Sequence, residues 1–195
     1  LSRSLGRLMY IRAAILCLLF NLNKLSIREL LTRVYAQSKG ISLEQLRMVY
    51  KNIGIIHHAR ETVASLCNHG YQVVLISSGV PDLFVKDLAI RLSAHDGYGI
   101  EIGTNDEKLT GEVSGRLSQP QGKKKLIEEM LNKNGLTWKD TVVLVDDRNN
   151  LDIMHNAGII IGINAHYAVR QRAHHLVDSG NLAEVLDILN IEDPD

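Results

Sequence analysis

The stretch Thr141-Val142-Val143-Leu144-Val145-Asp146-Asp147-Arg148-Asn149-Asn150 decides the fold. Its first half is an uncharged, β-branched run, which is typical of a strand buried on both faces of a parallel sheet. Its second half is polar and begins with two adjacent carboxylates. Carboxylates repel one another, so a pair at the end of a buried strand indicates a balancing cation. Oxygen ligands that are few in number suit Mg²⁺ with its retained waters and a substrate phosphate. The alternative is an Asp-rich turn that caps a helix.

Other apolar runs alternate with helical patterns on both sides of this stretch. Strands are predicted over 71–76 and 159–163 and a hairpin over 99–113, with helices over 60–67, 81–92, 123–132 and 151–156 and a last one from Asn181. Alternating β and α elements predict an α/β fold, an open parallel sheet with helices on both faces. Its site is expected at the carboxyl ends of the strands.

Residues 1–54 are predicted as a helical region without a strand of its own. Ser42 and Gln45 form the pattern of a capping box that begins one of its helices. The stretch from Ala13 to Asn23 is uncharged but only 11 residues long, whereas a membrane span needs about 20. We therefore expect a buried helix and no transmembrane segment. A weaker hypothesis places this helix on a membrane surface, because basic residues flank it: Arg3, Arg7 and Arg12.

The composition excludes several classes of protein. Lysine plus arginine equals aspartate plus glutamate, 22 each, so no overall charge attracts nucleic acid. Cys17 and Cys67 are the only cysteines and lack zinc-ligand spacing, which predicts reduced thiols and a cytoplasmic protein. Hydrophobic residues make up 45%, enough at this length for a substantial core.

Two further polar clusters lie where such a sheet binds ligands. Ser77-Ser78-Gly79 ends the first predicted strand and offers hydroxyls and backbone N–H groups at a helix start, which suits a phosphate oxygen. The alternative is an ordinary turn. Lys123 begins a helix and can neutralise phosphate or a neighbouring carboxylate. Because Lys124 and Lys125 follow it, a solvated basic turn is the alternative there.

The order of the three clusters resembles the later motifs of haloacid-dehalogenase-type (HAD) phosphatases, in the phosphoserine-phosphatase-like branch. The strand ending at Gly79 is similar to that family's strand ending in Ser-Gly-Gly, and Leu109–Val113 matches its Leu-Thr-Gly-x-Val hairpin. Asp146–Asn150 stands where the family has Asp-Gly-x-Asn-Asp. The likeness covers residues 55–189 well. It implies a HAD-like Rossmannoid core over 55–195 and a small helical cap over 1–54.

The resemblance also implies a function and roles for the site residues. It implies a Mg²⁺-dependent phosphomonoesterase that acts on a small phosphorylated metabolite through an aspartyl-phosphate. Ser77 would bind the phosphoryl oxygens with help from the N–H groups of Ser78 and Gly79, and Lys123 would hold phosphate and nucleophile together. The remaining assignments are a phosphate contact for Asn149, the Mg²⁺ ligand Asp146, and places near the metal for Asp147 and Asn150.

Three departures from the family pattern qualify these expectations. The family's nucleophile and general acid/base lie in an Asp-x-Asp motif ahead of the cap, but no aspartate precedes Asp82. We therefore expect an inactive chain with unpaired strand edges, truncated from a longer enzyme; the alternative is a non-catalytic module that regulates a fused or bound partner. Asn150 replaces an acidic residue, and Asp147 is expected to compensate for it. The arginine that binds the phosphoserine carboxylate in the family has no secure counterpart in this sequence. Arg33 is the nearest, so the substrate is expected to be a small phosphorylated metabolite, with phosphoserine as one candidate.

Overall fold

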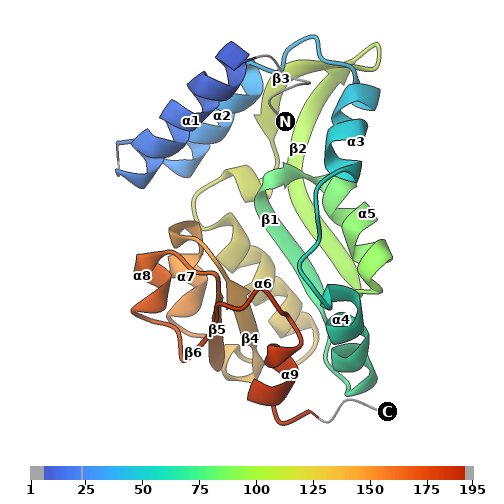
Figure 1. Cartoon of the computed structure of the whole chain (residues 1–195), viewed down its shortest axis with the longest axis vertical. Coiled ribbons are helices and arrows are strands. Elements are labelled where there is room, and N and C mark those ends of the chain that lie inside the picture. The colour runs from blue at the N-terminus through green and yellow to red at the C-terminus, as the bar shows by residue number, and fades with distance from the viewer. Residues whose placement is uncertain (1–6, 23, 192–195) are drawn as a thin grey trace. The chain divides into compact units, whose positions relative to one another are not determined.

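The computed structural model of the chain describes residues 7–22 and 24–191 (Figure 1). It divides into two compact units. One consists of Leu1–Gly54, Ile76–Asp87 and Tyr98–Pro120, and the other of Ile55–Leu75, Leu88–Gly97 and Gln121–Asp195. Three elements run from one unit into the other: β1 (Val74–Pro81), α5 (Asp82–Leu92) and β2 (Asp96–Asn105). The domain boundary at residue 54 stays a prediction.

Three helices begin the first unit, as expected: α1 (Arg7–Asn21), α2 (Ile27–Ala36) and α3 (Leu43–Lys51). Both later helices begin with a complete capping box, from Ser26 and Glu29 in α2 and from Ser42 and Gln45 in α3. In each box two otherwise unpaired backbone N–H groups find acceptors. Phe20 and Leu30 are buried where α1 and α2 pack together.

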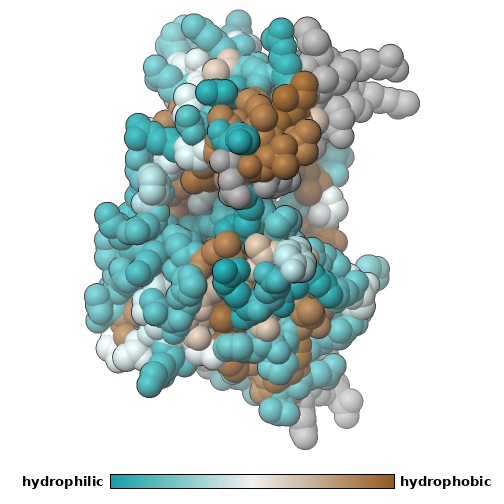
Figure 2. Space-filling model, turned by 90° about the vertical axis from the view of Figure 1, so that its left-hand side faces the viewer, coloured by the Kyte–Doolittle hydropathy of each residue, from teal (hydrophilic) through white to brown (hydrophobic). Residues whose placement is uncertain are grey.

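The outer face of α1 remains apolar. Its exposed large side chains are Ile15, Leu18 and Leu22, and Figure 2 shows apolar side chains gathered over this part of the first unit. No helix in the described part of the chain is long and apolar enough to cross a membrane. Arg3, which the membrane-surface hypothesis includes, lies outside the described residues.

A sheet with the strand order β1-β2-β3 completes the first unit, where β3 spans Lys108–Ser114. The predicted hairpin is confirmed, since β2 and β3 pair antiparallel, and a short helical turn, η1 (Arg116–Ser118), follows. Asp106 and Glu107 form the turn with φ values of 47° and 58°. Such left-handed values match the twist of a two-residue hairpin connection.

A parallel sheet forms the centre of the second unit, in the order β4-β5-β6. The elements of this unit not yet named are α4 (Ala59–Asn68), α6 (Gly122–Lys133), η2 (Trp138–Asp140), β4 (Val142–Val145), η3 (Arg148–Asn150), α7 (Leu151–Met154), β5 (Ile159–Ile163), α8 (Tyr167–Arg170), β6 (His175–Val177) and α9 (Glu184–Ile188). The predicted α/β class is confirmed.

Helices cover both faces of this parallel sheet. Val143, Val145 and Ile160 pack on one face against Met154 of α7 and Val169 of α8. The opposite face contributes Ile161 and Val177, which pack against Val185 of α9. Successive residues of a strand point to opposite faces, so an uncharged run such as 142–145 can fill two cores at once.

The strand predicted over 71–76 is displaced toward the C-terminus. It begins at Val74 and continues through the Ser77-Ser78-Gly79 cluster to Pro81, and most of its residues are only partly buried. The reason lies in its position, because β1 is the outer strand of its three-stranded sheet. The prediction that this strand ends before Ser77 was wrong.

Candidate active site

Lys123, Asn150 and Asp146 come together at the carboxyl end of β4. Lys123 is the second residue of α6, and Asn150 ends the short helical turn after β4. The Lys123 ammonium donates a hydrogen bond to Asn150 Oδ1 at 2.5 Å, and Asn150 Nδ2 donates to Asp146 Oδ1 at 3.4 Å. The neutral amide therefore bridges a cation and an anion, and it uses both of its ends to do so.

Lys123 is buried, with an exposed fraction of 8%. Burial lowers the pKa of this lysine, and the carboxylates of Asp146, Asp152 and Asp147 oppose that shift in decreasing order. The solvated basic turn is thereby excluded for Lys123, whereas Lys124 is partly exposed and pairs with Glu128 at 3.9 Å. A lysine ammonium has three hydrogens, so the contact with Asn150 leaves two for other oxygens.

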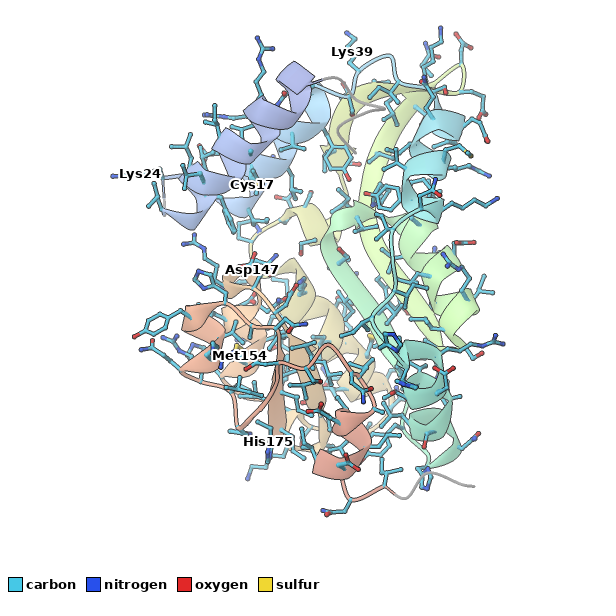
Figure 3. The ribbon with its side chains drawn as sticks, viewed as in Figure 1. Cys17, Lys24, Lys39, Asp147, Met154 and His175 are labelled. Atoms are coloured by element: carbon cyan, nitrogen blue, oxygen red, sulfur yellow. The ribbon has the colours of Figure 1, made fainter. Side chains whose placement is uncertain are left out.

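The two carboxylates of the acidic pair, Asp146 and Asp147, have different surroundings. Asp146 is exposed, and its backbone carbonyl accepts a hydrogen bond from His166 N at 2.7 Å. Asp147 Oδ1 accepts from Arg148 N at 2.6 Å and caps the helical turn that follows. Figure 3 shows Asp147 and His175 at opposite ends of the second unit. Since His175 begins the parallel strand β6, Asp147 lies on the carboxyl side of the sheet.

The donor set fits a hydrated Mg²⁺ held mainly by Asp146. Its carboxylate is exposed and keeps lone pairs free, as a cation that retains most of its waters requires. Asn150 already accepts from an ammonium, and Asp147 already caps a turn, so both are less available. Within residues 7–22 and 24–191 there is no group of three or more His, Cys, Asp or Glu side chains suited to a metal.

Asn149 Oδ1 is buried without a hydrogen-bond partner in the described part of the chain. A carbonyl oxygen and a phosphoryl oxygen are both acceptors, so they cannot pair. The predicted phosphate contact of Asn149 consequently requires its Nδ2 group.

Asp152 is a charged neighbour of Lys123 that the sequence analysis did not identify. It lies in α7, two residues after Asn150, and its Oδ1 is buried without a partner among the described residues. Its effect on the pKa of Lys123 ranks second among the carboxylates. The sequence shows only that residue 152 is acidic. Because the apolar periodicity predicts a helix there, an acidic residue in it has the pattern of an ordinary solvent-exposed side chain.

The Ser77-Ser78-Gly79 cluster belongs to the first unit. Ser77 Oγ accepts hydrogen bonds from Gly79 N at 3.2 Å and from Val80 N at 3.1 Å. These two contacts occupy both lone pairs of the hydroxyl, so its hydrogen remains available to an external acceptor. The Gly79 N–H group, which was predicted to bind phosphate, donates to Ser77 in this structure. Ser78 is buried.

Comparison with known proteins identifies the family. Residues 2–153 match the family of haloacid dehalogenase-like hydrolases. A phosphoserine phosphatase of Archaeoglobus fulgidus is 28% identical over 153 residues, which are 78% of this chain and 44% of that protein. One from Methanocaldococcus jannaschii is 26% identical over 163 residues, 84% of this chain and 77% of that protein.

Solved structures agree with the fold. A structure described as a phospho-aspartyl intermediate analogue of phosphoserine phosphatase has a TM-score of 0.86 at 24% identity and covers 95% of this chain and 89% of its own. The chain spans only 37% to 49% of the relatives from Streptomyces coelicolor, Archaeoglobus fulgidus and Haemophilus influenzae. Because the family match covers well over half of its residues, this chain belongs to the haloacid dehalogenase-like hydrolases, in their phosphoserine-phosphatase-like branch.

Proposed function

We propose that the protein is a Mg²⁺-dependent phosphatase of a small phosphorylated metabolite. The observation that carries this proposal is the buried Lys123, held by Asn150 beside three carboxylates at the carboxyl end of β4. A buried cation is costly unless anions balance it. Its two remaining ammonium hydrogens suit the oxygens of a phosphoryl group.

The residues of this chain would bind and orient the phosphoryl group. Ser77 would donate its free hydroxyl hydrogen to one phosphoryl oxygen, and Lys123 would stabilise negative charge on others. Asp146 would hold a hydrated Mg²⁺, which when bound neutralises phosphate charge and orients the group for attack. The covalent step needs an aspartate nucleophile. No aspartate precedes Asp82, where the order of the family's motifs would put the nucleophile, so these residues supply binding groups but not that nucleophile.

Phosphoserine fits this proposal as a substrate. Several relatives carry the name phosphoserine phosphatase, and Arg33 in the last turn of α2 is exposed. Its guanidinium can pair with a substrate carboxylate.

Binding of inorganic phosphate tests the proposal without relying on turnover. Calorimetry in the presence of Mg²⁺ should detect phosphate binding by the chain, and Lys123→Met should weaken it at least about tenfold through loss of a buried charge contact. Lys124→Met is the matched control and should retain wild-type affinity. Equal affinity in wild type and Lys123→Met would remove Lys123 from the phosphate site.

Hydrolysis of p-nitrophenyl phosphate gives the complementary result. The 195 residues should show no Mg²⁺-dependent turnover above background, because positioning groups without a nucleophile form no covalent intermediate. Turnover that persists through purification would contradict the assignment of the nucleophile.

A further inference from the structure

One tyrosine of the helical region contacts the Ser77 turn, and a second packs on α5. Tyr35 of α2 is buried, with an exposed fraction of 8%, and its hydroxyl donates a hydrogen bond to the Gly79 carbonyl oxygen at 2.9 Å. Tyr50 of α3 stacks on Phe84 of α5, with ring centroids 4.2 Å apart and an interplanar angle of 18°. All of these residues belong to the first unit.

The protonation of the two phenols follows from their burial. Burial raises the pKa of Tyr35 well above its ordinary value, and the neighbouring Tyr50 phenol raises it further. Burial also raises the pKa of Tyr50, so both groups stay protonated at neutral pH. Each phenol has one hydrogen. Tyr35 donates its one hydrogen to Gly79, so this contact uses its whole capacity as a donor.

A single peptide group connects Tyr35 to Ser77. The carbonyl that accepts from Tyr35 and the Val80 N–H that donates to Ser77 Oγ belong to the same planar unit, the peptide bond between Gly79 and Val80. Fixing the carbonyl at one end therefore fixes the direction of the N–H at the other. The orientation of the Ser77 hydroxyl depends on a phenol that is 42 positions away in the sequence.

We propose that Tyr35 begins a positioning relay, which acts through the Gly79–Val80 peptide and directs the Ser77 hydroxyl outward as a hydrogen-bond donor to phosphate. This inference rests on the proposed function, since it assumes that Ser77 binds a phosphoryl oxygen. It adds one residue that does not touch the ligand. Hydrogen bonds in such a chain polarise and strengthen one another.

A double-mutant cycle tests the relay, with inorganic phosphate and Mg²⁺ as the probe and calorimetry as the readout. Tyr35→Phe should weaken phosphate binding about fivefold, the effect of one lost hydrogen bond of ordinary strength. Tyr50→Phe keeps the stacking on Phe84 and leaves the Tyr35–Gly79 hydrogen bond in place, so it should bind phosphate like wild type. Tyr167→Phe is the control, because Tyr167 is exposed and its hydroxyl accepts from Gln171 in the second unit.

The Ser77→Ala background separates positioning from a structural role. If the relay acts through Ser77, Tyr35→Phe should cause no further loss of phosphate affinity in Ser77→Ala. A purely structural tyrosine would lower the urea midpoint and leave phosphate affinity unchanged, and that result would overturn the relay. Equal losses with and without Ser77 would also overturn it. If Ser77→Ala itself binds phosphate like wild type, the proposed role of Ser77 fails, and the relay fails with it.

Discussion

Among single residues, Asn150 occupies the most constrained position in the site. Its amide accepts from Lys123 and donates to Asp146, so it serves an ammonium and a carboxylate at once. A carboxylate at this position would still accept from Lys123, but it would face Asp146 with like charge. The balance of charge around Lys123 therefore depends on which side chain stands at 150.

Asn150→Asp should make the stability of the protein depend more strongly on Mg²⁺. The added carboxylate repels Asp146 in the absence of metal and becomes a second oxygen ligand in its presence. Thermal unfolding with and without MgCl₂ should show a larger rise in Tm for Asn150→Asp than for wild type. Asn132→Asp adds the same charge at an exposed position of α6 and should behave like wild type. A rise no larger than in this control would contradict the metal assignment.

Asp147 combines a capping contact with a charge near the site, and two substitutions separate these. Asp147→Asn keeps an acceptor for Arg148 N but removes the charge, whereas Asp147→Ala removes both. Urea unfolding should show a loss of about 1 kcal/mol for Asp147→Ala and little for Asp147→Asn. If Asp147 compensates for Asn150, both variants should bind Mg²⁺ more weakly. If both variants bind Mg²⁺ like wild type, the only role of Asp147 is to cap the helical turn that follows it.

Sequence patterns predicted these residues unequally. Lys123 and Asp146 could be identified because each stands at the end of a strongly patterned element. Asp152 and Tyr35 could not be identified. A carboxylate in a helix has the same sequence pattern whether it lies on the surface or in a site, and so does an aromatic residue at helical spacing. The partner of the Tyr35 hydroxyl is the Gly79 carbonyl, which no side-chain pattern encodes.

At the scale of secondary structure, the ends of β1 and of α7 differ most from the prediction. Apolar periodicity reports burial and not hydrogen bonding, and β1 is only partly buried. The apolar run therefore ends at Ile76, although the strand continues for five more residues to Pro81. The helix predicted over 151–156 is a single turn, Leu151–Met154. The buried strands β4 and β5 and the helix α6 are present where their patterns placed them.

Gly158 determines how β5 begins beside η2, and its replacement tests this contact. Its N–H donates to Trp138 O at 2.9 Å, and a Cβ atom there would collide with the Lys139 carbonyl group. Gly158→Ala should therefore lower the free energy of unfolding by about 1–3 kcal/mol, as overpacking does. Gly54→Ala is the control, because a Cβ at that position meets no atom within 4 Å. Urea denaturation measures the free energy of unfolding of both variants. If Gly158→Ala is as stable as Gly54→Ala, η2 can move aside and the contact is not tight.

At the scale of the whole molecule, the sheets have open edges. In the described part of the chain β1 is the outer strand of one three-stranded sheet, and β4 is the outer strand of the other. Outer strands expose N–H and C=O groups that pair readily with another chain. Natural edge strands often carry charges that prevent such pairing, but β4 consists of Val142-Val143-Leu144-Val145 and has none.

This edge predicts self-association of the 195-residue chain through β4. Leu144 has an exposed fraction of 38%, so a lysine there can reach water while it adds charge to the strand. Sedimentation velocity should show larger species at higher wild-type concentrations and fewer of them for Leu144→Lys, since charge on an edge strand disfavours pairing with a second copy. Leu136→Lys is the matched control, because Leu136 is 43% exposed and lies outside every strand. If both lysines suppress association equally, general surface hydrophobicity rather than the β4 edge drives it. If the wild-type chain stays monomeric at every concentration, the edge is protected and the prediction is wrong.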